Sequence, residues 1–166
     1  MKQHKARIKV TSRSFSRHHV LKQELLELFP NSVFNTDGPP TGIPNIVEFL
    51  KDADGVILGL EQMDRPVLQQ LENLKIVAKY GVGLDNLDVS AAEELGITVG
   101  WTGGVNKRSA SEQALTFMLG LSRNIFFSSF PLKVGKWEKE GGAFLTGKTV
   151  GIIGCGHIGT DIIYLL

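Results

Sequence analysis

The sequence has a single cysteine, Cys155, in 166 residues, so no disulfide bond can form within the chain. It has no apolar run that approaches the ~18 residues needed by a membrane-spanning helix. The first ten residues are basic and lack the apolar stretch of a signal peptide. These absences favour a cytoplasmic protein in a reducing compartment, with no membrane partner.

Acidic side chains are absent from residues 1–22, which hold seven of the 18 Lys and Arg residues. The whole chain nevertheless has a net charge of only +1. The basic start is either a solvated strand and helix surface or an electropositive patch that attracts a small anion. Nucleic acid is not an expected partner, because the chain has no sustained basic stripe with interleaved aromatic side chains.

The composition is otherwise that of an ordinary folded protein, with 42% apolar and 21% charged residues. Short apolar strands alternate with helical patterns over the first hundred residues. This alternation predicts an α/β fold, in which helices cover both faces of a parallel sheet. We expect strands at residues 6–11, 32–35, 55–60, 75–80 and 97–101, a helix at 45–51, and further helices capped by Ser16, Asp64 and Asp88.

The pair Gly103–Gly104 separates this alternation from a long helical pattern over residues 106–127. Its apolar positions lie on two faces, which predicts that the helix packs on its own domain and on another domain or subunit. Pro131 is expected to start a connecting segment. A strand over residues 148–153 and a helix over residues 156–166 complete the expected elements.

Gly154, Gly156 and Gly159 form a G-x-G-x-x-G pattern between this last strand and helix. The first glycine permits a tight turn, the second lets the backbone approach a pyrophosphate, and the third lets the helix lie close to the strand. Amides near His157 and Ile158 would face the phosphates. The pattern predicts a dinucleotide site, and the alternative is a glycine-rich turn that binds nothing.

The acidic residue that binds the cofactor ribose is expected ~20 residues after this motif. The chain ends seven residues after Gly159, so the sequence does not decide between NAD and NADP. Neither Cys155 nor His157 is expected to be catalytic, because both lie within the turn itself. No metal site is expected, since the other histidines lack the spacing of metal ligands.

A second glycine loop contains Gly81 and Gly83, directly after the expected fourth strand. A turn with unpaired amides at the carboxyl end of a strand can hold a carboxylate. Ligands of open α/β sheets bind at this edge, which groups the loop with residues 11–15 and 60–61. The alternative is an ordinary strand–helix turn in which Asp88 caps the next helix.

Four segments in order resemble the D-isomer-specific 2-hydroxyacid dehydrogenases, and the phosphoglycerate dehydrogenase type most closely: Tyr80–Asp88, Gly104–Asn106, Ser111–Leu115 and Val150–Gly159. Their order and spacing match over essentially the whole chain. The resemblance implies a flavodoxin-like substrate domain over residues 1–103. It also implies that residues 104–166 hold a dimerisation helix and the first strand and helix of a Rossmann NAD-binding domain.

The resemblance also implies roles for individual residues. The loop Tyr80–Gly83 would hold the carboxylate of a small anionic 2-hydroxy or 2-keto acid, with Val82 also bordering the nicotinamide. His157 and Ile158, with the three glycines of the turn, would contact the NAD pyrophosphate. Trp101 begins Trp-Thr-Gly-Gly where the family commonly has Asn-Thr-Pro-Gly.

Family catalysis uses an Arg, a Glu and a His from the later part of the nucleotide domain, and no position here matches them. We therefore expect the N-terminal portion of an oxidoreductase, inactive by itself, with no catalytic residue in this chain. The basic start suggests 3-phosphoglycerate as the substrate, as in serine biosynthesis, with Arg13 and Lys79 as anion partners. Alternatives are a non-catalytic, NAD-sensing or protein-binding module similar to corepressors, and a flavodoxin-like module whose remaining residues only dimerise. A homodimer through residues 106–127 is expected.

Overall fold

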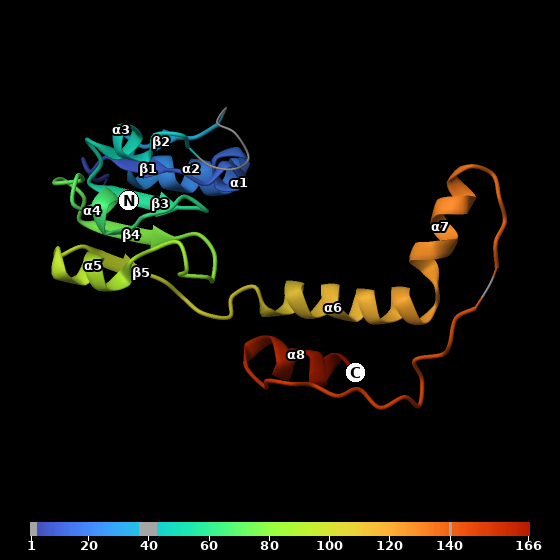
Figure 1. The fold of residues 1–166 in the computed structure, drawn as a ribbon. Coiled ribbons are helices and arrows are strands. Elements are labelled where there is room, and N and C mark those ends of the chain that lie inside the picture. The colour runs from blue at the N-terminus through green and yellow to red at the C-terminus, as the bar shows by residue number, and fades with distance from the viewer. Residues whose placement is uncertain (1–2, 37–42, 140) are drawn as a thin grey trace. The chain divides into compact units, whose positions relative to one another are not determined.

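The computed structural model describes residues 3–36, 43–139 and 141–166. The chain divides into two compact units, Met1–Gly103 and Gly104–Leu166, and Figure 1 shows the elements of each. The division falls between the two residues of the Gly103–Gly104 pair. None of the helices in the described ranges combines the length and apolar character needed to cross a lipid bilayer.

A five-stranded parallel sheet forms the centre of the first unit, with strand order β2-β1-β3-β4-β5. This order is that of the flavodoxin-like folds, so the predicted α/β fold class is confirmed. The strands are β1 (Ile8–Val10), β2 (Val33–Phe34), β3 (Gly55–Leu58), β4 (Ile76–Lys79) and β5 (Thr98–Gly100).

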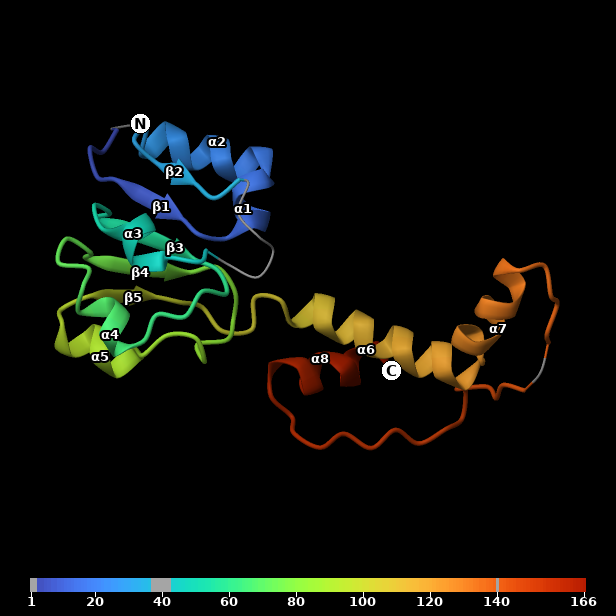
Figure 2. The same ribbon diagram turned by 45° about the horizontal axis from the view of Figure 1, so that its top comes forward.

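Five helices connect these strands in the described residues of the first unit. Because parallel crossovers are right-handed, the connection from β1 to β2 lies on one face and the other connections lie on the opposite face. Figure 2 shows α2 beside β2, and α4 together with α5 near β5. The helices are α1 (Arg13–Arg17), α2 (His19–Leu28), α3 (Ile46–Leu50), α4 (Arg65–Leu68) and α5 (Val89–Glu94).

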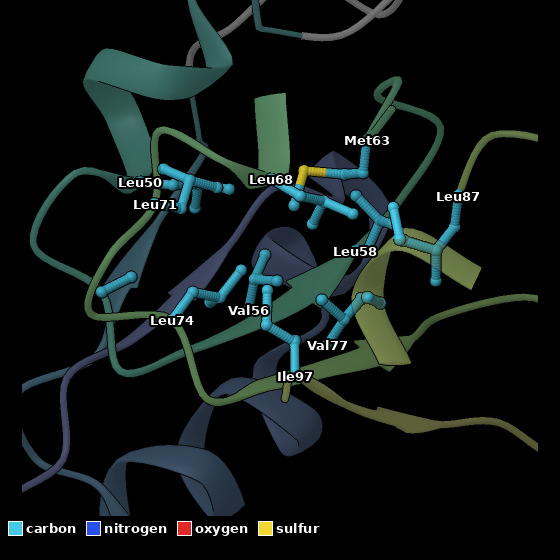
Figure 3. Close-up of a cluster of buried hydrophobic side chains, with 13 residues drawn as sticks. Leu50, Val56, Leu58, Met63, Leu68, Leu71, Leu74, Val77, Leu87 and Ile97 are labelled. Atoms are coloured by element: carbon cyan, nitrogen blue, oxygen red, sulfur yellow. The ribbon is translucent and has the colours of Figure 1, made fainter. Parts of the chain in front are cut away.

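The hydrophobic core lies between β3, β4 and the helices α3, α4 and α5 (Figure 3). Val56 pairs with Val77 in the sheet register, which places both side chains on this face, and both are at most 1% exposed. Burying a side chain of this kind stabilises a fold by about 1.5–3 kcal/mol relative to leaving it in water. The core therefore holds β3 and β4 in place, and with them the carboxyl ends of both strands.

The helix expected after Ser16 forms as α2, but its N-cap is His18 rather than Ser16, because a separate short helix, α1, ends at Arg17. Ser12 caps α1, with its Oγ accepting a 3.3 Å hydrogen bond from the Phe15 amide. His18 is extended and caps α2 by accepting from the Leu21 amide. Ser16 is buried and donates to the Ser12 carbonyl oxygen at 2.8 Å, so its hydroxyl serves the interior of α1 rather than its start.

The two aspartate caps are confirmed. Asp64 Oδ1 accepts from the Val67 amide at 3.1 Å, and Asp88 Oδ1 accepts from the Ala91 amide at 2.8 Å. Each carboxylate satisfies an amide that has no partner within the first turn of its helix. These caps fix where the chain leaves the loops that follow β3 and β4.

The second unit contains α6 (Lys107–Ser122), α7 (Ile125–Lys133) and α8 (His157–Leu165), with α6 packed along α8. The expected helix over residues 106–127 is wrong at its end. Asn124 adopts a left-handed conformation with φ 57°, so the backbone turns there and α7 starts. Pro131 lies inside α7 instead of ending the helical stretch.

The strand expected over residues 148–153 is not formed. A strand needs a neighbour that pairs with its backbone, and the described part of this unit provides none. The helix expected after it is confirmed as α8, whose N-cap is Gly156. The turn before α8 is therefore formed, although no strand precedes it in the described residues of this unit.

Replacing Asp88 with Ala is expected to lower the free energy of unfolding of the first unit by about 1 kcal/mol, because the Ala91 amide loses its acceptor. Urea denaturation followed by circular dichroism measures this change. Glu93→Ala, which removes an exposed carboxylate from the same helix, is the matched control. An equal loss in the two variants would contradict the capping role of Asp88.

Candidate functional site

A hollow of about 580 Å³ opens at the carboxyl ends of the strands in the first unit. The chain leaves the neighbouring strands β1 and β3 towards opposite faces of the sheet, and ligands of such folds bind at this divergence. The segment that directly follows each of the strands β1 to β4 contributes to the lining. The residues include Ser12, Arg13, Asn35, Gly59, Glu61 and Tyr80.

The hollow carries charges of both signs. Arg13 lines it, and the buried Nε of this residue has no hydrogen-bond partner in the described chain. Arg17 also lines it and donates to the Thr36 carbonyl oxygen at 3.3 Å. Glu61 is only 8% exposed, and its buried Oε2 has no partner among the described residues. Leaving a buried polar group unpaired costs about 1–3 kcal/mol, which favours a site built for a polar ligand.

Most of the basic start does not reach this hollow. Arg7 and Lys9 both form ion pairs with Asp52, and Lys9 also lies over the Phe49 ring. The Lys9 ammonium is the main reason that the pKa of Asp52 is lowered. The carboxylate of Asp52 thus partly neutralises these two basic residues, and the anion-attracting interpretation rests on Arg13 and Arg17.

The predicted glycine loop follows β4 at the same sheet edge. Gly81 has φ 141°, a conformation that favours glycine. In the described chain, the amides of residues 81–83 donate to no protein acceptor. The indole Nε1 of Trp101 donates to the Val82 carbonyl oxygen at 2.9 Å and so orients that peptide. Three adjacent free amides can donate hydrogen bonds to a carboxylate.

Tyr80 links the loop to the hollow. Its amide donates to the Leu58 carbonyl oxygen at 2.9 Å, which continues the pairing of β4 with β3 beyond the strand. Its ring meets Phe15 edge to face, with the ring centroids 5.3 Å apart. The half-exposed ring thereby becomes one wall of the hollow, directly before Gly81.

Lys79 does not line the hollow. Its Nζ donates to the Gly59 carbonyl oxygen and to Asn86 Oδ1, both at 2.6 Å. Asn86 in turn donates to the Glu61 carbonyl oxygen at 2.6 Å. Burial lowers the pKa of Lys79, although the carboxylates of Asp85 and Glu61 act in the opposite direction. Lys79 therefore connects the loop after β3 to the loop after β4.

The predicted dinucleotide turn lies in the second unit, immediately before α8. Gly154 has φ 97°. A Cβ on Gly159 would lie 2.1 Å from the Gly154 carbonyl oxygen, so no side chain fits there. A Cβ on Gly156 would meet no other atom within 4 Å, which leaves the backbone open on that side. The first amides of α8, including those of His157 and Ile158, begin at this opening.

Contacts with α6 hold this turn in place. The Ile158 carbonyl oxygen accepts from the buried hydroxyl of Ser111 at 3.3 Å. Arg108 forms a 3.0 Å ion pair with Asp161, which is 5% exposed. The His157 ring packs over Gly104, where a Cβ would come within 2.6 Å of it. His157 is thus packed at the start of this unit, and five of the six predicted cofactor residues gather in one turn. Val82, the sixth, belongs to the first unit.

Eight lining residues of the hollow were not predicted as site residues: Thr11, Ser12, Ser14, Arg17, Asn35, Gly59, Leu60 and Glu61. The carboxyl-edge rule identified the loop of residues 11–15 but did not separate its members. Asn35 could have been found by the same rule, because it directly follows β2. Arg17 could not, because its approach to the hollow depends on the turn of chain within α1.

A family model of the D-isomer specific 2-hydroxyacid dehydrogenase catalytic domain matches residues 15–156. The chain belongs to this family. The resemblance stated from the sequence is thereby confirmed.

Relatives and solved structures are consistent with this assignment. The chain is 41% identical over 109 residues to hydroxypyruvate reductase of Thermotoga maritima, covering 64% of this chain and 36% of that protein. It is 39% identical over 109 residues to D-3-phosphoglycerate dehydrogenase of Archaeoglobus fulgidus, covering 64% of this chain and 21% of that protein. The chain thus spans well under half the length of these relatives.

Two crystal structures match nearly the whole chain and about half of their own. One is the NAD⁺-bound 3-phosphoglycerate dehydrogenase of Entamoeba histolytica, with TM-score 0.76, 25% identity and coverage of 98% and 50%. The other is an NADPH-dependent glyoxylate/hydroxypyruvate reductase of Sinorhizobium meliloti, in complex with NADP and malonate, with TM-score 0.71, 27% identity and coverage of 98% and 50%.

Replacing Gly159 with Ala is expected to open the turn before α8, because the new Cβ would collide with the Gly154 carbonyl oxygen. Forced overpacking of this kind costs about 1–3 kcal/mol. The amide NMR signals of residues 154–160 should shift strongly. In Gly156→Ala they should shift little, because φ at this residue is −76° and a Cβ meets open space. Similar spectra for the two variants would contradict the close packing at Gly159.

Proposed function

We propose that this chain is the N-terminal portion of an NAD-dependent oxidoreductase that transfers hydride to or from the CH–OH carbon of a D-2-hydroxy acid. The observation that carries the proposal is the row of free amides at residues 81–83, beside a hollow that contains Arg13. This arrangement suits the carboxylate of a small acid. Family membership supports the same chemistry.

The residues of this chain would bind and orient the two reactants. The amides of the glycine loop would hold the substrate carboxylate, with Trp101 fixing the peptide of Val82. The turn Gly154–Gly159 and the first amides of α8 would hold the cofactor pyrophosphate, because helix N-termini attract anions. Bound nicotinamide supplies the hydride acceptor or donor. Holding the reacting atoms in place lowers the barrier by reducing the entropy lost at the reaction step.

We infer that the 166 residues alone do not catalyse this reaction. No position in them matches the Arg, Glu and His of the family, and a general acid or base contributes a rate factor of about 10²–10⁴. The matched relatives are much longer than this chain, which covers only 36% and 21% of two of them.

The single cysteine, Cys155, is exposed and fits the reducing cytoplasm that we propose as the location.

Two classes of substrate fit the hollow. For 3-phosphoglycerate, and hence a role in serine biosynthesis, the support is that Arg13 and Arg17 line the hollow and that several relatives carry the name phosphoglycerate dehydrogenase. For an unphosphorylated hydroxy acid, the support is the buried carboxyl of Glu61. The hydroxypyruvate reductase of Thermotoga maritima is a relative of this second type.

Adding D-glycerate to the chain is expected to shift the amide NMR signals of residues 81–83, because its carboxylate would accept from them. The signals of Gly96 and Ile97, at the other end of the sheet, are the internal control and should stay unchanged. NADH fluorescence should show binding weaker than micromolar. A longer form of the protein with the Arg, Glu and His should oxidise a D-2-hydroxy acid with NAD⁺. Tight NADH binding without any oxidation by that form would favour an NAD-sensing, corepressor-like module instead.

We further propose that α6 takes part in a homodimer. Phe117 and Leu121 on this helix are 49% and 63% exposed, and large exposed apolar patches mark association surfaces. Leu121→Asp should shift the chain to monomer in sedimentation experiments, because the carboxylate would lose water on association. Glu112→Ala, on an exposed polar position of α6, should leave the association unchanged. A monomeric wild-type chain at tens of micromolar would overturn the proposal.

A further inference from the structure

Glu61 occupies an unusual place for an acidic residue. It is the third residue after the end of β3. Glu61 is 8% exposed, whereas the preceding Leu60 is 78% exposed. Both residues line the hollow, with the apolar residue exposed to solvent and the acidic one buried. The backbone holds this arrangement, because Asn86 donates to the Glu61 carbonyl oxygen at 2.6 Å.

The carboxyl group lies close to Gly59, which also lines the hollow. A Cβ on Gly59 would come 3.1 Å from Glu61 Oε2 and 3.0 Å from the Ser12 Cα, so the carboxyl sits close over Gly59. In the described ranges of the chain, neither oxygen of the carboxyl accepts a hydrogen bond from the protein. The nearby ammonium of Lys79 donates to Gly59 and Asn86 instead.

Arg13 is the complementary group. It lines the same hollow, and its buried Nε donates to no acceptor in the described residues. No ion pair between Arg13 and Glu61 exists among the described contacts, so neither charge is neutralised by the other. A hydroxyl group can satisfy both at once, since it donates one hydrogen and accepts others. A phosphate can only accept, and it would bring negative charge next to a carboxylate that needs a donor.

We propose that Glu61 selects 2-hydroxy and 2-keto acids whose distal carbon carries a hydroxyl group, over the corresponding phosphate esters. The proposal rests on the proposed function, because it assumes that the substrate carboxylate occupies the amides of residues 81–83. From there the distal hydroxyl would enter the hollow that Glu61 and Arg13 line, where it would donate to the carboxylate and accept from the guanidinium. Glu61 is thus a specificity-determining residue.

The test compares three acids on the 166-residue chain: D-glycerate, D-3-phosphoglycerate and D-lactate. Binding is followed by the amide NMR signals of residues 12–14 and 81–83. D-glycerate should bind at least tenfold more tightly than D-3-phosphoglycerate, and more tightly than D-lactate, which has no distal hydroxyl. Only D-glycerate should shift the signals of residues 12–14 strongly.

Glu61→Gln retains an acceptor oxygen but removes the negative charge. This variant should bind D-3-phosphoglycerate about tenfold more tightly than the wild-type chain while changing D-glycerate binding only a few-fold. Glu61→Ala should abolish the preference for D-glycerate over D-lactate. Glu93→Gln makes the same change in net charge at an exposed position outside the hollow and should alter none of these values. Unchanged signals from the core residues of each variant confirm that it folds.

The outcomes separate the two proposals. If the acids shift residues 81–83 but D-3-phosphoglycerate binds as tightly as D-glycerate, the role of Glu61 is overturned and the proposed function stands. The same holds if Glu61→Gln and Glu93→Gln have equal effects. If no acid shifts residues 81–83 even at high concentration, the proposed function fails, and the role of Glu61 fails with it.

Discussion

Parallel pairing of β1 with β3, extended one residue beyond the strands, is the constraint on which the site depends. Thr11 is fully buried, its amide donates to the Ile57 carbonyl oxygen at 3.0 Å, and its Oγ1 accepts from the Gly59 amide at 2.8 Å. The side chain therefore fastens the two strands together just where their chains separate. Ser12, Gly59 and the residues that follow them owe their positions around the hollow to this fastening.

Periodicity and capping chemistry allowed much of the fold to be predicted from local sequence. The alternation of strands and helices indicated the parallel sheet, and Asp64 and Asp88 were recognisable as caps because an acidic side chain preceded an apolar helical pattern. The cap at His18 was missed, and so was the break at Asn124, since the apolar pattern of residues 106–127 continues across Asn124. The strand over residues 148–153 was predicted from its own composition, but a strand forms only with a partner.

The candidate site was predictable in outline and not in its electrostatics. The glycine patterns and the carboxyl-edge rule located both loops. They did not show that Lys79 is used within the protein or that Glu61 turns inward beside an exposed Leu60. Both facts depend on contacts between segments distant in sequence, chiefly those made by Asn86. A charge counted along the sequence therefore says little about the charge that a ligand meets.

The hydrogen bond from Trp101 to the Val82 carbonyl oxygen connects two loops that lie far apart in the sequence. Trp101 lies three residues before Gly104, where the second unit begins. The indole thus ties the glycine loop after β4 to the stretch of chain that leads out of the first unit, and the two stretches keep one geometry while this hydrogen bond is made.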